Sequence, residues 1–543
     1  MITFDTSDEM YHRVFNNFIF HHAPFYDNYS IQLMQISHEL LAAGSYRIQA
    51  NIENNVLGLT IHSNETSGFR YALNSLHHWL KTGPINPLDT SDCPQFLIRG
   101  VIEGFYGKPW THQQRMRSLD YFGDFGLNSY FIAPKDAPWQ RFNWRAPFNR
   151  DFLNLTQALV ERGAINGIDV SICVSPGLSV KYSDDADVDA VITRFKQLYD
   201  IGVTHFGLLW DDISWELQHE EDLQKYPTTS IAHADFSNRI YSQITDLDIN
   251  NRLSVCPMHY NGRGVIPYIE ELGSRLHSNV NLMWTGRQIC SEYLDISDAL
   301  VFEKSAHRKP LYWDNFPVND GSMQSNLHIG PIRGREKGLH NYSVGLLSNP
   351  MLQGEASLLP IATIGEYLWN SEKYIPEVSW EKALESLIPD TFERGALRDF
   401  YRTSLGSTVG GDPAPDLRKV FNKAVSYWRA GDVHQSANLF EEAGKKIEDN
   451  FLFLTSDNFT HKVLISEICE WLEKYRLGGE VLVGVSKILR MCSFDKEKKL
   501  ITGPDTAPKQ ISELLELLQT HKKRLFGDQI EGPFNELIAE LSG

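Results

Sequence analysis

Residues 204–214 read THFGLLWDDIS, a short apolar run that ends in two adjacent aspartates. Seven more β-rich runs lie between residues 98 and 349, separated by helical segments of about a dozen residues or more. The eight runs are IRGVIE (98–103), NSYFIAP (128–134), IDVSICVSP (168–176), THFGLLW (204–210), RLSVCPM (252–258), NVNLMWT (279–285), KPLYWDN (309–315) and YSVGLLSN (342–349). Eight strand-and-helix units predict a (β/α)8 barrel of the α/β class, whose active site lies at the C-terminal ends of its strands.

The sequence pattern changes on both sides of the barrel, so we expect three domains. These are an N-terminal α/β domain (1–95), the barrel catalytic domain (96–375) and an all-helical C-terminal domain (376–543). The N-terminal domain shows, in order, an amphipathic stretch (31–43), strand-like runs from Tyr46 and from Leu57, and a helix around 67–80.

The C-terminal domain is helical in pattern and is interrupted most clearly at LGSTVGGDPAP (405–415), which we expect to join two helices or subdomains. Its apolar runs FLFLT (451–455) and VLVGV (481–485) could support a homodimer or help to shape the cleft. The sequence does not choose between these options.

Composition limits the classes of partner. The chain has 543 residues, with 51 Lys and Arg against 69 Asp and Glu, a formal charge of -18. This charge argues against binding to nucleic acid or to an anionic membrane. No apolar run reaches the roughly 20 residues of a membrane span, and the N-terminus shows no signal peptide. The six cysteines have no CxxC pair, so we expect reduced thiols and a cytoplasmic protein; secretion stays open if a leader was removed.

Polar and aromatic residues follow the predicted strands. They include Glu103, Gly104, Lys135, Asp136, Ser175, Asp211, Asp212, Cys256, His259, Tyr260, Trp284, Thr285, Trp313, Asp314, Asn315, Asn319, Asp320 and Asn349. Carboxylates, one lysine, amides and aromatic rings at one mouth suit a carbohydrate, because hydroxyls need polar partners and the C–H face of a sugar stacks on aromatic rings.

The adjacent pair Asp211 and Asp212 is the sharpest of these features. Two carboxylates held close titrate as a coupled unit, so one can stay protonated near neutral pH and serve as a general acid. Adjacent side chains of an extended strand point to opposite faces. Both can therefore serve one pocket only if the strand turns at this end.

Eight motifs resemble, in chain order, family 84 of the glycoside hydrolases. They are RGVIEGFYGKPW (99–110), APKD (133–136), SPGL (175–178), WDDI (210–213), CPMHY (256–260), MWTG (283–286), WDN with ND (313–315, 319–320) and SNP (348–350). This family contains the O-GlcNAcases and their bacterial β-N-acetylglucosaminidase and hyaluronidase-like relatives. Departures at Ala137, at Met258 with His259, and at Gly321 concern the rim and leave the aglycone open.

The resemblance implies a retaining β-N-acetylglucosaminidase without metal or cofactor. It acts on a β-GlcNAc glycopeptide or glycoside, and the acetamido group of the substrate forms an oxazoline. By motif position, Asp211 orients the acetamido N–H, Asp212 is the acid and base, and Tyr260 binds the acetamido oxygen. Sugar hydroxyls bind at Gly104, Lys135, Asn315, Asp320 and Asn349, while Trp313, Cys256 and Thr285 surround the N-acetyl methyl group.

Other interpretations remain open at this point. The aspartates could cap a helix or hold Mg²⁺ or Mn²⁺, Lys135 could pair with Asp136, and Cys256 could be an ordinary buried thiol. We expect Glu103 to be structural, bonded to backbone or to Arg99. The protein could also be a catalytically silent glycan-binding module, or a metal-dependent lyase or aldolase.

Overall fold

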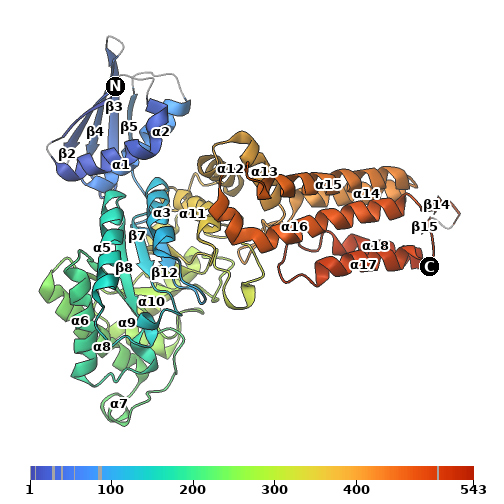
Figure 1. Ribbon diagram of the computed structural model, residues 1–543. Coiled ribbons are helices and arrows are strands. Elements are labelled where there is room, and N and C mark those ends of the chain that lie inside the picture. The colour runs from blue at the N-terminus through green and yellow to red at the C-terminus, as the bar shows by residue number, and fades with distance from the viewer. Residues whose placement is uncertain are drawn as a thin grey trace. The chain divides into compact units, whose positions relative to one another are not determined.

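The computed structural model describes residues 2–6, 8–26, 31–37, 41–53, 56–82, 88–497 and 500–542. The described chain forms two compact units, which are shown in Figure 1 and treated separately below. The first comprises residues 1–315, 334–350 and 364–374, and the second comprises residues 316–333, 351–363 and 375–543. None of the described helices combines the length and apolar character that a membrane span requires.

A closed barrel of eight parallel strands forms most of the first unit, as the eight runs predict. Its strands are β6 (Ile98–Glu103), β7 (Ser129–Ile132), β8 (Asp169–Val174), β9 (His205–Leu209), β10 (Arg252–Cys256), β11 (Asn281–Trp284), β12 (Pro310–Asp314) and β13 (Gly345–Ser348). They are almost wholly buried because helices cover the barrel outside while side chains fill its interior.

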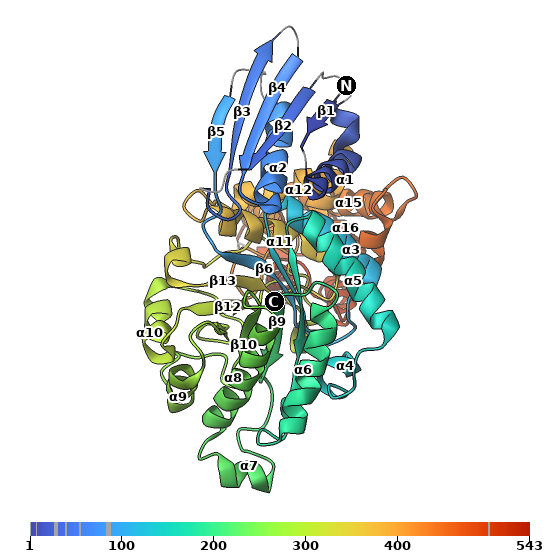
Figure 2. The same ribbon diagram turned by 90° about the vertical axis from the view of Figure 1, so that its left-hand side faces the viewer.

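Helices connect most of these strands, and Figure 2 shows several of them outside the barrel. They are α3 (His112–Asp124), α4 (Pro138–Arg141), α5 (Arg150–Ile165), α6 (Asp185–Tyr199), α7 (Glu220–Lys225), α8 (Thr229–Leu247), α9 (Pro267–Arg275) and α10 (Ile296–Ala306), with α11 (Gly354–Trp369) after β13. The connection from β12 to β13 differs from the expected helical crossover, because residues 315–344 contain only the 3₁₀ turns η2 (Gly321–Met323) and η3 (Leu339–Tyr342).

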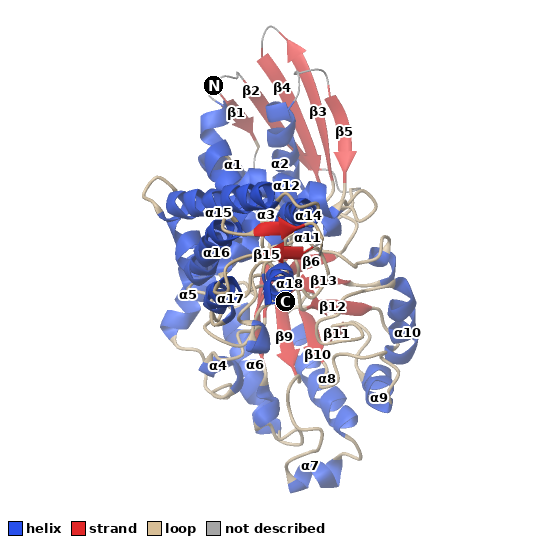
Figure 3. Cartoon of the chain, turned by 90° about the vertical axis from the view of Figure 1, so that its right-hand side faces the viewer, coloured by secondary structure: helices blue, strands red, loops and turns tan. Residues whose placement is uncertain are grey.

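The N-terminal α/β region contains a five-stranded mixed sheet in the order β1-β2-β4-β3-β5. Its elements are β1 (Ile2–Asp5), α1 (Glu9–Tyr26), β2 (Ile31–Ser37), β3 (Tyr46–Glu53), β4 (Val56–Ser63), α2 (Thr66–Thr82) and β5 (Leu88–Asp92). Helices α1 and α2 pack on one face of the sheet around residues such as Val14, Ile61 and Phe69 (Figure 3).

The amphipathic stretch at 31–43 contains a strand. Its first seven residues, Ile31–Ser37, are β2, which pairs in parallel with both β1 and β4. Residues 38–40 lie outside the described residues, and residues 41–43 belong to no helix or strand. Pairing on both sides satisfies the backbone polar groups of the strand, so tertiary context decides its conformation.

The second unit is mainly helical, as predicted for the C-terminal part of the chain. Its helices include α12 (Pro376–Leu387), α13 (Thr391–Tyr401), α14 (Pro415–Arg429), α15 (Val433–Thr455), α16 (Lys462–Leu489), α17 (Ala507–Gln519) and α18 (Glu531–Ser542), and a small hairpin pairs β14 (Ser493–Asp495) with β15 (Leu500–Thr502). The 405–415 segment joins α13 to α14, in line with its Gly and Pro content.

Helices α15 and α16 pack closely where Gly444 faces Gly479. A Cβ at Gly444 would lie only 2.8 Å from the Gly479 carbonyl oxygen, so the glycine permits this close approach. Val481, Leu482 and Val485 of the VLVGV run are buried within this unit. These three side chains therefore form part of its core, whereas Leu452 of the FLFLT run is 64% exposed. Formation of a homodimer stays a prediction, as does the three-domain division.

Candidate active site

The two aspartates follow β9 at the C-terminal end of the barrel. Asp212 has a backbone φ of +56°, in the left-handed region that residues with a Cβ rarely adopt. The chain therefore turns at the second aspartate, as one shared pocket would require. Both carboxylates act electrostatically on Tyr106, Tyr260 and Cys256, so they lie around the same group of side chains.

Asp211 is buried in a charged pair. Its Oδ2 accepts a hydrogen bond from Lys135 Nζ, and the two side chains are 7% and 2% exposed. The Lys135 ammonium also lies 5.3 Å from the centroid of the Trp313 ring. The alternative pair with Asp136 is not formed, since Asp136 Oδ2 accepts instead from the Gly107 backbone N–H at 2.7 Å. The other carboxylate oxygen, Asp211 Oδ1, is buried and has no hydrogen-bond partner.

Asp212 has different surroundings. It is exposed, and two phenols donate to its carboxylate: Tyr260 to Oδ1 at 2.9 Å and Tyr106 to Oδ2 at 2.8 Å. Burial and then the Asp212 charge and hydrogen bond raise the pKa of both tyrosines, so both phenols stay protonated as donors. The pair thus contains one carboxylate held by a cation and one held by neutral donors.

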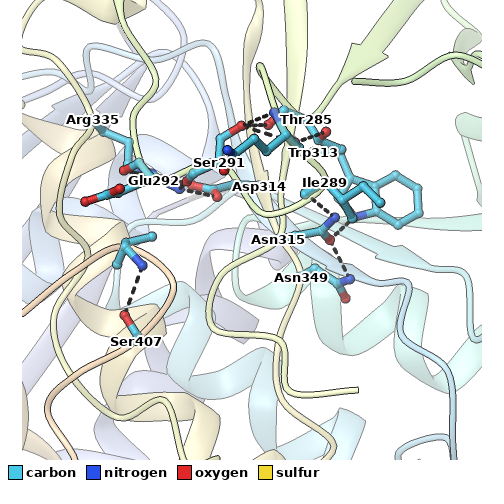
Figure 4. A network of polar contacts seen from close by, with 12 residues as sticks. Thr285, Ile289, Ser291, Glu292, Trp313, Asp314, Asn315, Arg335, Asn349 and Ser407 are labelled. Carbon is cyan, nitrogen blue, oxygen red and sulfur yellow. Dashed lines mark hydrogen bonds and ion pairs between the residues drawn. The ribbon is translucent and has the colours of Figure 1, made fainter. Parts of the chain in front are cut away.

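A chain of amide contacts, drawn in Figure 4, connects three other predicted site residues to β6. Trp313 Nε1 and Asn349 Nδ2 both donate to Asn315 Oδ1 at 2.9 Å. Asn349 Oδ1 accepts in turn from the Gly104 backbone N–H at 3.2 Å. The network connects the ends of β12, β13 and β6.

Gly104 is required by the close approach of Trp313. A Cβ at this position would lie 2.2 Å from Trp313 Cζ2, far inside van der Waals contact. The glycine thus lets the indole pack against the backbone after β6. Trp313 is 5% exposed and belongs to the cluster of side chains that fills the barrel.

The other predicted residues take several positions. Burial raises the pKa of the Cys256 thiol well above its usual value, so this buried side chain stays protonated, and its place in the pocket wall stays a prediction. Thr285 Oγ1 donates to the Gln288 carbonyl at 2.7 Å. Asp320 lies in the second unit, and its role at this site stays a prediction. Trp210 and Trp284 are core residues, stacked on His233 and Phe302.

Glu103 is structural, as expected, and of the two partners proposed for it the backbone is the one observed. Its carboxylate accepts from Arg115, from Tyr130 Oη at 2.7 Å and from the Trp110 backbone N–H at 3.1 Å. Arg99, the other proposed partner, donates instead to backbone carbonyls and to Tyr71 Oη.

The sequence analysis did not identify three residues of the site. Tyr106 lies inside the EGFYG motif, whose resemblance pointed to it without a role. Arg141 donates to Tyr106 Oη, and Arg335 forms a buried ion pair with Asp314, directly between Trp313 and Asn315 (Figure 4). Arg141 could have been found only by its position, because it is the last residue of α4, the short helix that follows β7.

Within the described part of the chain, no three His, Cys, Asp or Glu side chains form a cluster suited to a metal ion. The positive charge beside Asp211 is the Lys135 ammonium. Cys173, Cys256 and Cys492 are buried free thiols.

The fold and the site define the class of the protein, a (β/α)8 barrel of the glycoside hydrolase type. The family model for beta-N-acetylglucosaminidase matches residues 99–402, more than half of the chain. The O-GlcNAc hydrolase of Thermobaculum terrenum, solved as a mutant, is 30% identical, with a TM-score of 0.75 over 82% of this chain and 95% of that one. The chain therefore belongs to the β-N-acetylglucosaminidase family, glycoside hydrolase family 84, as its motifs predict.

Other relatives agree with this assignment. Protein O-GlcNAcase of Rattus norvegicus and that of Mus musculus are each 29% identical over 279 residues, which is 50% of this chain and 30% of theirs. The match thus spans less than a third of either relative. The structure of CpGH84B shares the fold, with a TM-score of 0.81, 23% identity and coverage of 99% of this chain and 96% of that one.

Proposed function

We propose that the protein removes β-linked N-acetylglucosamine from glycopeptides or small glycosides, with the acetamido group of the substrate as the nucleophile. The observation that carries this proposal is the unequal pair of carboxylates. Asp211 is buried, is charge-balanced by Lys135 and has one oxygen without a partner, whereas Asp212 is exposed and contacts only neutral donors among its side-chain partners. Such a pair can divide the roles of charge stabiliser and proton donor.

In the first step, Asp211 Oδ1 accepts the acetamido N–H, which orients the group and stabilises the positive charge that develops on it. The acetamido oxygen attacks the anomeric carbon, and the bond from that carbon to the leaving oxygen breaks. Protonated Asp212 donates its proton to the leaving oxygen. In the second step, Asp212 takes a proton from water, whose oxygen attacks the anomeric carbon and opens the oxazoline with retention of configuration.

The remaining site residues support binding of one sugar. Asn315 and Asn349 are already ordered by each other and by Trp313 and Gly104, so little side-chain entropy is lost when hydroxyls bind there. Tyr260 now donates to Asp212, and contact with the acetamido oxygen would require its hydroxyl to change partner. Lys135 has three N–H donors and retains capacity for a hydroxyl beside Asp211.

Turnover of a nitrophenyl β-GlcNAc glycoside tests the proposal, with the α-anomer and the β-glucoside as controls. We expect only the β-GlcNAc glycoside to react, and Asp212→Asn to lower kcat by about 10²–10⁴-fold. An N-trifluoroacetyl substrate should also react slowly, because electron withdrawal weakens the internal nucleophile. Full rate in Asp212→Asn, or no sensitivity to the fluorinated group, contradicts the mechanism.

The same preparation separates the enzyme from a glycan-binding module. Micromolar binding of GlcNAc without turnover would favour the module. If turnover occurs, rates on a GlcNAc-bearing peptide, a chitobiose glycoside and a hyaluronan oligomer identify the class of aglycone and the choice between exo and endo cleavage.

A further inference from the structure

Arg141 contacts the two aspartates at their backbone rather than at their carboxylates. It is the last residue of α4, and its side chain is buried, with the residue 5% exposed. One terminal nitrogen donates to Tyr106 Oη at 2.7 Å. The other donates to the backbone carbonyl of Asp212 at 3.0 Å and lies 3.4 Å from that of Asp211. A single guanidinium therefore reaches the backbone of both aspartates and the phenol that contacts the Asp212 carboxylate.

The backbone of Asp212 needs such support. Its φ of +56° lies in the left-handed region, which is unfavourable for a residue with a Cβ. A left-handed residue persists only where neighbouring groups hold it. The hydrogen bond from Arg141 to the Asp212 carbonyl holds the turn, and the two tyrosines hold the side chain.

The contacts also form a directed chain of hydrogen bonds. Arg141 donates to Tyr106 Oη, and the Tyr106 hydroxyl donates to Asp212 Oδ2. Each bond in such a chain polarises the next, so the cation strengthens the donor that contacts the carboxylate. Tyr260 is the second donor, and the charged neighbours are Asp211 with its partner Lys135.

We infer that Arg141 is a positioning residue for the general acid, acting through Tyr106 and through the backbone of the 211–212 turn. This inference rests on the proposed function, because it assigns proton donation to Asp212. The inference predicts an effect that depends on the leaving group of the substrate. A displaced acid slows a reaction whose leaving group needs a proton, and has little effect on a reaction whose leaving group departs as a stable anion.

Two β-GlcNAc aryl glycosides test the inference, one with a strongly acidic dinitrophenol and one with the weakly acidic methylumbelliferone. In Arg141→Met and in Tyr106→Phe, we expect kcat/KM to fall by a factor at least about tenfold larger for methylumbelliferone than for dinitrophenol. Arg141→Lys keeps the charge but not the two-pronged geometry, so its loss should lie between those of wild type and Arg141→Met.

Arg145→Met is the matched control. Arg145 lies four residues further along, and its guanidinium bonds Asp187 and Ser179 rather than the acid pair. This variant should change kcat/KM for both substrates by the same factor. Tyr106→Phe removes only one hydroxyl, so it remains informative if Arg141→Met does not fold.

Equal losses on the two substrates in Arg141→Met and in Tyr106→Phe would overturn the inference. Absence of turnover by the wild type on either substrate would refute the proposed function itself, and the inference with it.

Discussion

Replacement of Lys135 by Met removes the cation beside a buried carboxylate. Lys135 and Asp211 have side-chain exposures of 2% and 7%, so water cannot solvate the Asp211 charge when its partner is lost. Breaking a buried pair on one side costs about 3–5 kcal/mol of folding free energy. Loss of the contact between the ammonium and the Trp313 ring adds about 0.5–2 kcal/mol.

The loss of folding free energy should appear as a lower melting temperature of the variant. In the first unit, of roughly 340 residues, a loss of 3–5 kcal/mol lowers Tm by about 4–7 °C.

Thermal melts of Lys135→Met and wild type at pH 7 measure this loss. Lys181→Met is the matched control, because Lys181 and its partner Glu221 are 29% and 59% exposed, and its loss should cost under about 1 kcal/mol. Adding Asp211→Asn to Lys135→Met should recover part of the stability, since no charge is then left buried. A penalty below about 1 kcal/mol at pH 7 refutes this account of the pair.

Three further expectations follow from the site and its surroundings. Gly104→Ala should displace Trp313, whose ring lies 2.2 Å from the new Cβ, and should lower kcat/KM by about tenfold or more while the far-UV spectrum stays unchanged. Arg335→Met leaves Asp314 buried without its partner, so urea unfolding should show a loss of about 3–5 kcal/mol. Burial lowers the pKa of His233 to about 3, so between about pH 6.5 and 3 the unfolded chain binds a proton that the folded chain does not. As the pH is lowered through this range, the free energy of unfolding should decrease by up to about 1.4 kcal/mol per pH unit. Urea midpoints of His233→Gln should depend less steeply on pH than those of the wild type.

The barrel could be predicted from the sequence because each strand is a short apolar run followed by residues of another kind. All eight predicted runs contain the observed strand, and β6 coincides with its run, Ile98–Glu103. The N-terminal region was harder to predict because its signals are short and ambiguous. IQLMQIS at β2 supports both helical and strand interpretations, and its two neighbouring strands decide the outcome.

The site shows a similar division. Aspartates, amides and aromatic residues at strand ends could be identified because strand ends converge in a barrel. The contacts between loops could not be identified, because no spacing in the sequence relates Arg141 to Tyr106 or Arg335 to Asp314. Arg141 and Arg335 were also hard to find because each acts on a neighbouring side chain, Tyr106 or Asp314, that is distant in the sequence.

The left-handed turn at Asp212 explains how adjacent residues of one type can differ in role. If the chain stayed extended after β9, the two side chains would point to opposite faces, and one would lose the shared neighbours Tyr106, Tyr260 and Cys256. The turn keeps both carboxylates among these neighbours but gives Asp211 the cation and Asp212 the phenols. The backbone conformation at Asp212, rather than the residue type, thus creates the asymmetry on which a division between charge stabiliser and proton donor depends. That conformation is strained, which is why a buried cation such as Arg141 at the Asp212 carbonyl matters for the chemistry as well as for the fold.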